Sequence, residues 1–167
     1  MEIRIKETDI ISAAEAGMDD FVQLFYDRTM QAIGGQLTAD TMNQLSPDQV
    51  TLIAYMILRE EVMDGGFIQL IHNGYGPFIF LNPFAKAMRL WGLHDFSKLI
   101  YRGRKLYEEH ADALTRDCSD EEFMALFEQY PDFDDLDDEF VETEEMLTAL
   151  VAQYIDEHIE NFALVEK

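Results

Sequence analysis

Apolar residues recur along most of the chain at the three- and four-residue spacing of an amphipathic helix. Residues 19–33 and 93–113 both show this spacing over several turns. Residues so spaced lie on one side of a helix, so each series predicts a helix with one buried face. The sequence has no strand–helix–strand alternation and no internal repeat. We therefore expect an all-α protein, folded as a single compact multi-helix domain over residues 1–167.

The most apolar of the predicted helices begins at Ser46-Pro47-Asp48-Gln49. Serine is a favoured N-cap, and proline fits the first helical position. The following segment, VTLIAYMILREEVM, is apolar on nearly every side until Arg59, which is typical of a buried helix. Gly65-Gly66 then interrupts it, although each glycine inside a helix costs about 1 kcal/mol relative to alanine. We expect the pair to end or bend this helix, so that the next helix, led by Phe67, packs closely back on it.

The rest of the pattern predicts shorter elements and one more long helix. Ser119 and Glu122 form a capping-box sequence at the start of a helix that stops before Pro131. The segment DFDDLDDEF is an acidic connector or the entry to a helix, and a long amphipathic helix is predicted from about Glu139 to Phe162. The apolar segment 77–82 is expected to be irregular. The terminal segments EIRIKE and FALVEK predict at most one minor strand pair.

Charge is distributed very unevenly along the chain. The formal net charge is -22, from 34 Asp and Glu against 12 Lys and Arg. Residues 1–116 carry a net charge of -5, whereas the acidic C-terminal third, residues 117–167, carries -17 and contains Lys167 as its one basic residue. This charge repels phosphates and anionic lipid surfaces, so we expect neither direct nucleic-acid binding nor membrane association.

Features of the N-terminus and the cysteine content indicate a cytoplasmic protein. The sequence MEIRIKETDI mixes charges and lacks the apolar region of a signal peptide. Cys118 is the single cysteine, so no intramolecular disulfide can form, and this usage fits a reducing compartment.

No constellation of reactive or metal-binding residues predicts an enzyme. The two EF-hand registers that begin at Asp132 and Asp135 place apolar residues at required positions, and the histidines are not at zinc-ligand spacing with Cys118. The glycine pairs lack the lysine of a phosphate-binding loop. We therefore expect no catalysis, no metal and no cofactor. Gln69, His72 and Asn73 share a predicted helix face that would suit a small-ligand site, although capping and core hydrogen bonds explain them more simply.

The densest acidic run lies between Asp120 and Glu145, where 13 of 26 positions are acidic and none is basic. In a continuous helix this is about 3 Å of axis per charge, close to the phosphate spacing of about 3.4 Å along one strand of duplex DNA. The alternative is a solvated face that only keeps the protein soluble. The outward carboxylates that would imitate phosphates are Asp132, Asp134, Asp135, Asp137, Asp138, Glu139, Glu142 and Glu145.

A basic cluster opposes this acidic run. Six Lys or Arg residues and one acid lie between Lys86 and Lys105. Lys98, Arg102 and Lys105 share one helix face because they are spaced four and then three residues apart. This cluster could dock on the acidic third, either within the chain or across a homodimer, and so neutralise part of its charge.

One stretch of sequence resembles a known family. The run from Glu61 to Gln69, EVMDGGFIQ, is followed by His72-Asn73-Gly74 and then by a short apolar helix that ends at Gly92. Over residues 46–112 this order resembles the signature of a bacterial domain-of-unknown-function family that includes an acidic DNA-mimic protein. The resemblance implies an all-α fold and, for the characterised mimic, an acidic dimer that occupies the DNA-binding face of transcription factors or nucleoid proteins. The signature residues, which we expect to be structural, are Glu61, Gly65, Gly66, Phe67, Gln69 and Asn73.

The acidic run and the resemblance together predict a DNA-mimic-type protein. It would bind and block the DNA-binding surface of a basic transcription factor or nucleoid protein. Two alternatives stay open at this point. One is a generic protein-interaction module whose charge only solubilises, and the other is a small-ligand binder at Gly65-Gly66 and Gln69.

Overall fold

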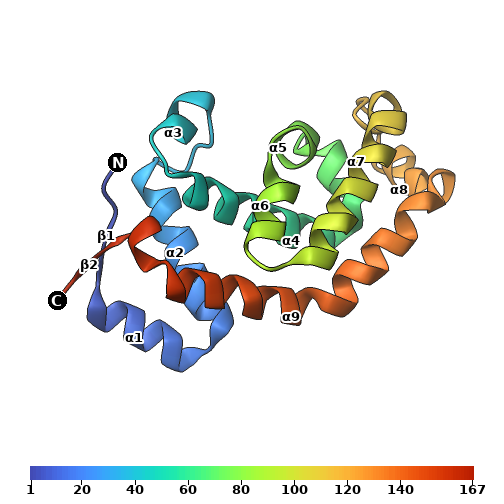
Figure 1. Ribbon diagram of the computed structural model, residues 1–167. Coiled ribbons are helices and arrows are strands. Elements are labelled where there is room, and N and C mark those ends of the chain that lie inside the picture. The colour runs from blue at the N-terminus through green and yellow to red at the C-terminus, as the bar shows by residue number, and fades with distance from the viewer. The chain divides into compact units, whose positions relative to one another are not determined.

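A computed structural model describes all 167 residues and confirms the all-α fold class with one minor strand pair. Contacts divide the chain into two compact units, one made of Met1–Met56 with Glu145–Lys167 and the other of Ile57–Glu144. The expectation of a single domain over the whole chain stays a prediction. In chain order the elements are β1 (Arg4–Lys6), α1 (Glu7–Ala16), α2 (Met18–Ala32), α3 (Ala39–Asn43), α4 (Pro47–His72), α5 (Gly76–Phe80), α6 (Phe84–Leu90), α7 (His94–Leu114), α8 (Asp120–Gln129), η1 (Pro131–Phe133), α9 (Asp134–Glu157), η2 (Ile159–Asn161) and β2 (Leu164–Glu166) (Figure 1).

The two chain termini meet in the first unit. β1 and β2 pair in parallel, with Arg4 opposite Leu164 and Ile5 opposite Val165 (Figure 1). Ile5 is buried, whereas Arg4 and Lys6 on either side of it are exposed, as the alternation of apolar and charged residues in this segment requires. The predicted pairing of the terminal segments is therefore confirmed.

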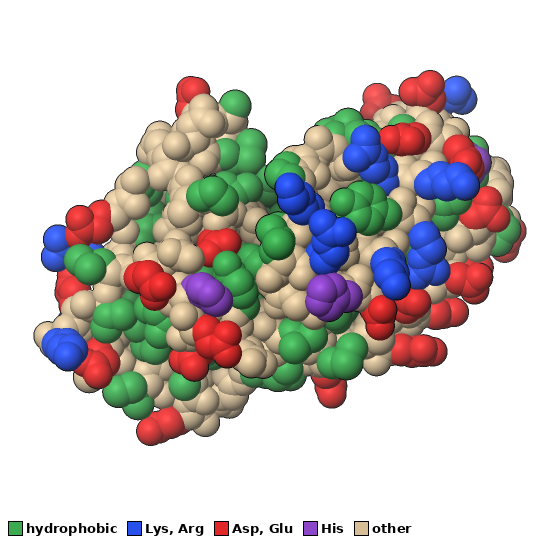
Figure 2. Space-filling model, in the orientation of Figure 1, with side chains coloured by type: hydrophobic (Ala, Val, Ile, Leu, Met, Phe, Trp, Pro, Cys, Tyr) green, Lys and Arg blue, Asp and Glu red, His purple; other side chains and the backbone are tan.

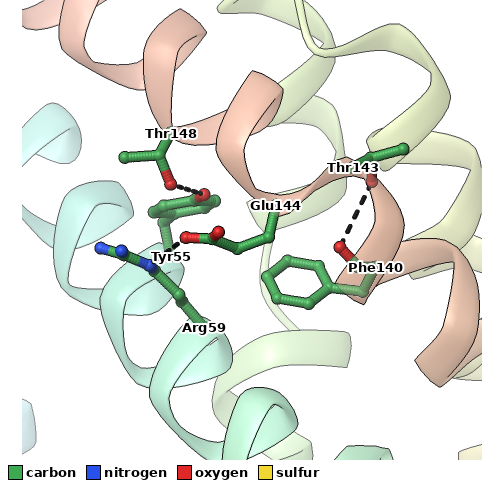
Figure 3. A network of polar contacts seen from close by, with 6 residues as sticks. All are labelled: Tyr55, Arg59, Phe140, Thr143, Glu144 and Thr148. Carbon is green, nitrogen blue, oxygen red and sulfur yellow. Dashed lines mark hydrogen bonds and ion pairs between the residues drawn. The ribbon is translucent and has the colours of Figure 1, made fainter. Parts of the chain in front are cut away.

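The first unit also holds the start of α4, at the residues that the sequence indicates. The Ser46 backbone N–H donates to Gln49 Oε1 at 2.8 Å, and the Gln49 backbone N–H donates to Ser46 Oγ at 3.1 Å. These reciprocal bonds satisfy two of the donors that a helix leaves unpaired at its N-terminus. Farther along, Tyr55 of α4 and Thr148 of α9 are both fully buried, and their hydroxyl oxygens lie 2.8 Å apart (Figure 3).

In the second unit α4 bends sharply at the glycine pair. Gly65 has φ -147° and ψ 18°, and Gly66 has φ 74° and ψ -177°, so neither residue is helical. A positive φ of this size is strained for residues with a side chain, and glycine adopts it at little cost. Phe67, the first residue after the bend, is fully buried. The predicted bend is confirmed, and its positive φ explains the glycine at position 66.

Helix α7 organises the packing of the second unit. Phe80 of α5 stacks on Tyr107 of α7 with ring centroids 5.3 Å apart, and the ring centroids of Phe96 of α7 and Phe140 of α9 lie 5.7 Å apart.

The expectation that residues 77–82 are irregular is wrong, because α5 spans Gly76–Phe80. Proline in its first turn suits a helix start, and Ile79 and Phe80 at its end are buried in the core.

None of the helices combines the length and the apolar character that crossing a lipid bilayer requires.

Candidate functional site

The acidic segment consists of α8, η1 and the first half of α9. The predicted capping box is present in α8, where the Glu122 backbone N–H donates to Ser119 Oγ and the Ser119 backbone N–H donates to Glu122 Oε1, both at 3.2 Å. Three acids occupy the first turn of α9, where the helix dipole stabilises negative charge.

Helix α9 begins five residues before the predicted start near Glu139 and ends at Glu157 rather than Phe162. Phe133, Leu136 and Phe140 explain the early start, because they recur at helical spacing and are almost completely buried. Of the two alternatives for this segment, a connector or the entry to a helix, the structure shows the helix entry, and the apolar side of the helix fixes which carboxylates point outward.

Four of the candidate acids form an exposed row on α9. Asp134, Asp138 and Glu142 follow one another at four-residue spacing along one side of the helix, and Asp135 lies next to Asp134. All four are exposed, and none has a Lys, Arg or His nitrogen within 4.0 Å. We call these four residues the α9 acidic face. Figure 2 shows Asp and Glu side chains gathered along the border of the molecule where this part of α9 runs.

Three more candidates lie outside this face. Asp132, in η1, is exposed, and its Oδ2 lies 3.9 Å from His110 Nε2. Glu139 forms an ion pair with Arg102 of α7, so its charge is compensated within the protein. Glu145 is exposed and belongs to the part of α9 that lies in the other compact unit.

The last candidate, Asp137, points into the fold. Its Oδ1 accepts a hydrogen bond of 2.8 Å from the Phe67 backbone N–H, at the start of the helical segment that follows the bend in α4. A Cβ at Gly66 would overlap the Asp137 carboxylate. Asp137 therefore acts as an N-cap supplied from another helix, and it requires glycine at position 66.

The environment of Asp137 raises the pKa of its carboxyl group from 3.8 to about 6. Burial is the largest cause, because it disfavours the charged form. The hydrogen bond from Phe67 lowers the pKa, and the negative charges of Asp134 and Asp138 raise it again. This carboxyl group therefore changes between its neutral and charged forms near pH 6, at a higher pH than an ordinary carboxyl group.

A further acid of α9, Glu144, was not among the candidates, and the structure shows that it serves the fold. Its side chain is 11% exposed, and its Oε1 accepts a hydrogen bond of 2.6 Å from Arg59 Nε of α4 (Figure 3). A pair this deeply placed cannot present a charge to a partner, because the arginine neutralises it.

The polar signature residues hold the two segments of α4 together across the bend. Gln69 Nε2 donates to Glu61 Oε2 at 2.8 Å and to Asp64 Oδ2 at 2.9 Å, and Asn73 Nδ2 donates to Glu61 Oε2 at 3.0 Å. Gln69 and Asn73, two of the side chains that suggested a small-ligand site, are thus engaged with acids of the preceding helical segment. This matches the simpler of the two interpretations of that face.

One contact has no counterpart in the sequence analysis. His72 Nδ1 lies 2.8 Å from the Leu114 carbonyl oxygen, which can only accept, so Nδ1 carries the proton. His72 Nε2 then faces Cys118 Sγ at 4.0 Å. These residues lie 46 positions apart, and no spacing rule connects them. No group of three or more His, Cys, Asp or Glu side chains is arranged to hold a metal ion.

Comparison with known proteins covers both the bend and the acidic helix. Residues 43–158 match the protein family described as DMP19-like protein. The chain is also 35% identical over 125 residues to the DNA mimic protein DMP19 of Neisseria meningitidis serogroup B, an alignment that spans 74% of this chain and 76% of that protein. The family match extends well beyond residues 46–112 and includes the α9 acidic face.

Proposed function

The chain belongs to the family of DMP19-like proteins, and on this basis we propose that it is a DNA mimic that binds and blocks the DNA-binding surface of a basic transcription factor or nucleoid protein. The observation that carries the proposal is the α9 acidic face, a row of exposed carboxylates without basic partners.

The spacing of this face suits a surface that binds phosphates. Asp134 and Glu142 are eight residues apart, which is about 12 Å of helix axis at 1.5 Å per residue. Four carboxylates over this length give about one charge per 3–4 Å, comparable with one phosphate per 3.4 Å or so along a strand of duplex DNA. A protein surface that binds successive phosphates with Lys and Arg would find a similar average density of negative charge here.

The carboxylates are also free to act on a partner. Because none is paired with a basic residue of the protein, their field extends into solvent and attracts a basic surface before contact. Exposed charges are screened over about 8 Å at physiological ionic strength, so the association rate should fall steeply with added salt. Asp132 and Glu145 are exposed and stay candidates for partner binding, whereas Asp137 and Glu139 already have partners in the fold.

The proposed function also implies where the protein acts. A target that binds chromosomal DNA requires a cytoplasmic site of action in a bacterium, and blocking such a target would regulate transcription.

We also propose a homodimer, which would present two acidic faces to a dimeric target. Sedimentation equilibrium of the purified protein tests the homodimer directly.

Competition for DNA tests the proposed function. A fluorescein-labelled duplex is bound by a basic nucleoid protein or helix-turn-helix repressor of the same host at low salt, and the protein is then titrated in. We expect a fall in DNA anisotropy as the target is withdrawn, and a smaller fall at high salt because the charges are then screened. The variant with Asp134→Asn, Asp135→Asn, Asp138→Asn and Glu142→Gln should lose most of this activity.

A matched control separates the face from the total charge. Glu15, Asp20, Asp40 and Asp156 are exposed, form no ion pair and lie in the other compact unit. Replacing these four with Gln and Asn removes the same charge and should leave competition close to that of the wild type. If both variants compete as well as the wild type, the acids only solubilise the protein and a generic interaction module is the better description. If no basic DNA-binding protein of the host is displaced, the mimic proposal is wrong.

A further inference from the structure

A positively charged surface lies on the same unit as the α9 acidic face. It consists of six exposed residues, which we call the basic face: Lys86 and Arg89 of α6, with Lys98, Arg102, Arg104 and Lys105 of α7. Figure 2 shows Lys and Arg side chains gathered over α6 and α7. Such a surface is unexpected in a chain with a net charge of -22, and the proposed DNA mimicry does not use it.

Most of the basic face is not neutralised by the protein itself. Arg102 pairs with Glu139, and Arg104 pairs with Glu108 one turn along α7. Lys86, Arg89, Lys98 and Lys105 form no ion pair. Docking of the basic cluster on the acidic third within the chain is therefore limited to Arg102, and the cluster keeps its positive charge.

The basic face also has a hollow whose walls are partly apolar. A cavity of about 310 Å³ opens between the α5–α6 connection and α7, with Leu81, Pro83 and Tyr101 in its wall. Lys86 and Arg104 stand in the same lining. Leu81 is 54% exposed and Tyr101 49% exposed, although both are large apolar side chains that burial would stabilise. The hollow thus combines apolar walls with two cations.

We propose that the basic face binds an acidic peptide segment of a partner protein, with one apolar side chain of that segment seated in the hollow. Charge complementarity supplies the reason for an acidic occupant, because Lys86, Arg89, Lys98 and Lys105 have no acidic partner of their own. The hollow supplies the reason for an apolar anchor, because buried aromatic or aliphatic anchors give protein interfaces much of their affinity.

The neighbourhood of the face favours a short peptide over nucleic acid. Arg102, at its edge, is paired with Glu139, so the cations give way directly to the carboxylates of α9. A duplex or a long single strand that extended past this edge would place phosphates beside carboxylates and be repelled. A short acidic peptide can remain within the cationic area, and screening over about 8 Å limits the effect of more distant acids on it.

Fluorescence anisotropy with a synthetic probe tests the proposal. The probe is a fluorescein-labelled dodecapeptide in which Asp and Glu flank a central Phe, used at low salt with the full-length protein. We expect saturable binding that is weakened about tenfold by the double substitution Lys86→Gln and Arg104→Gln, since it removes both cations of the hollow. Replacing the Phe of the probe with Ala should weaken binding about as much, and replacing its acids with Gln and Asn should abolish it.

The control variant carries Lys6→Gln and Arg116→Gln, which also removes one exposed Lys and one exposed Arg without ion pairs. It should bind the probe nearly as well as the wild type does, and circular dichroism should show both variants folded. Absence of saturable binding, or equal weakening by the control, overturns the proposal. Displacement of the probe by a short oligothymidylate at similar concentration also overturns it and identifies a phosphate-binding surface. If the probe does not bind but the double substitution changes the sedimentation coefficient, the proposal is overturned, and the basic face contacts a second copy of the chain.

Discussion

Replacing Asp137 with Asn should change how the stability of the protein depends on pH. The amide side chain of the Asp137→Asn variant retains an oxygen that accepts the hydrogen bond from the Phe67 backbone N–H, but it has no charge to be desolvated. In the wild type, burial raises the pKa of Asp137 to about 6, so the charged form is disfavoured in the folded state. The substitution therefore removes a titration while keeping the cap.

The sign and size of the effect follow from the two pKa values. Between the ordinary value of 3.8 and the folded value of about 6, the native state binds more protons than the unfolded chain. The contribution of Asp137 to the free energy of unfolding is thus fully present below pH 3.8 and is lost as the pH rises through 6. The part of this effect that falls between about pH 5 and about pH 7.5 is about 1.4 kcal/mol, or about 1 kcal/mol after allowance for the partial exposure of the side chain.

Urea denaturation of both proteins at about pH 5 and about pH 7.5 measures this effect. The quantity of interest is the free energy of unfolding of the Asp137→Asn variant minus that of the wild type. We expect this difference to be about 1 kcal/mol more positive at the higher pH. The exposed neighbour Asp135→Asn is the control, and its difference should stay within about 0.3 kcal/mol between the two pH values because a surface charge has little influence on folding. A difference for Asp137→Asn that is constant with pH, or that becomes more negative as the pH rises, would refute the reasoning.

Two further substitutions test the contacts that position α9. Gly66→Ala should destabilise the protein by about 2 kcal/mol or more, since it combines a positive φ with a clash against Asp137. The control Gly34→Ala has a similar φ but open space around the added Cβ, and it should cost about 1–2 kcal/mol. Equal melting temperatures for the two variants would contradict this account. Arg59→Met should lower the free energy of unfolding by about 2–3 kcal/mol, because it leaves Glu144 with an uncompensated charge. Adding Glu144→Gln should recover part of that loss, as measured by chemical denaturation. A double variant less stable than Arg59→Met would argue against the pairing.

The sequence predicts the local features of this fold better than its tertiary contacts. The capping residues at Ser46 and Ser119 and the glycine bend were predictable because each depends on residues only a few positions apart. The start of α9 was placed too late, because the acids around Leu136 obscure the apolar spacing that fixes it. The cap that Asp137 provides to Phe67 spans 70 positions, and no local pattern reports a contact of that kind.

The same limit applies to the candidate binding residues. In the sequence the nine acids from Asp132 to Glu145 are equivalent, because each is a carboxylate in a run without basic residues. In the fold they differ in what they contact: Asp137 caps the bend in α4, and Glu139 pairs with Arg102. An acid that neutralises a cation or caps a helix has little charge to offer a partner, since its field is already compensated.

The glycine bend and the acidic helix are therefore parts of one structural arrangement. The bend exposes the Phe67 backbone N–H, which needs an acceptor because it lies at the start of a helical segment in the core. Asp137 supplies that acceptor, and together with the buried apolar residues of α9 it fits one rotation of the helix about its axis. At this rotation Phe133, Leu136 and Phe140 turn inward, and Asp134, Asp138 and Glu142 turn toward solvent. The capping and packing residues of this arrangement thus determine which carboxylates are available for binding, although they do not belong to the binding face.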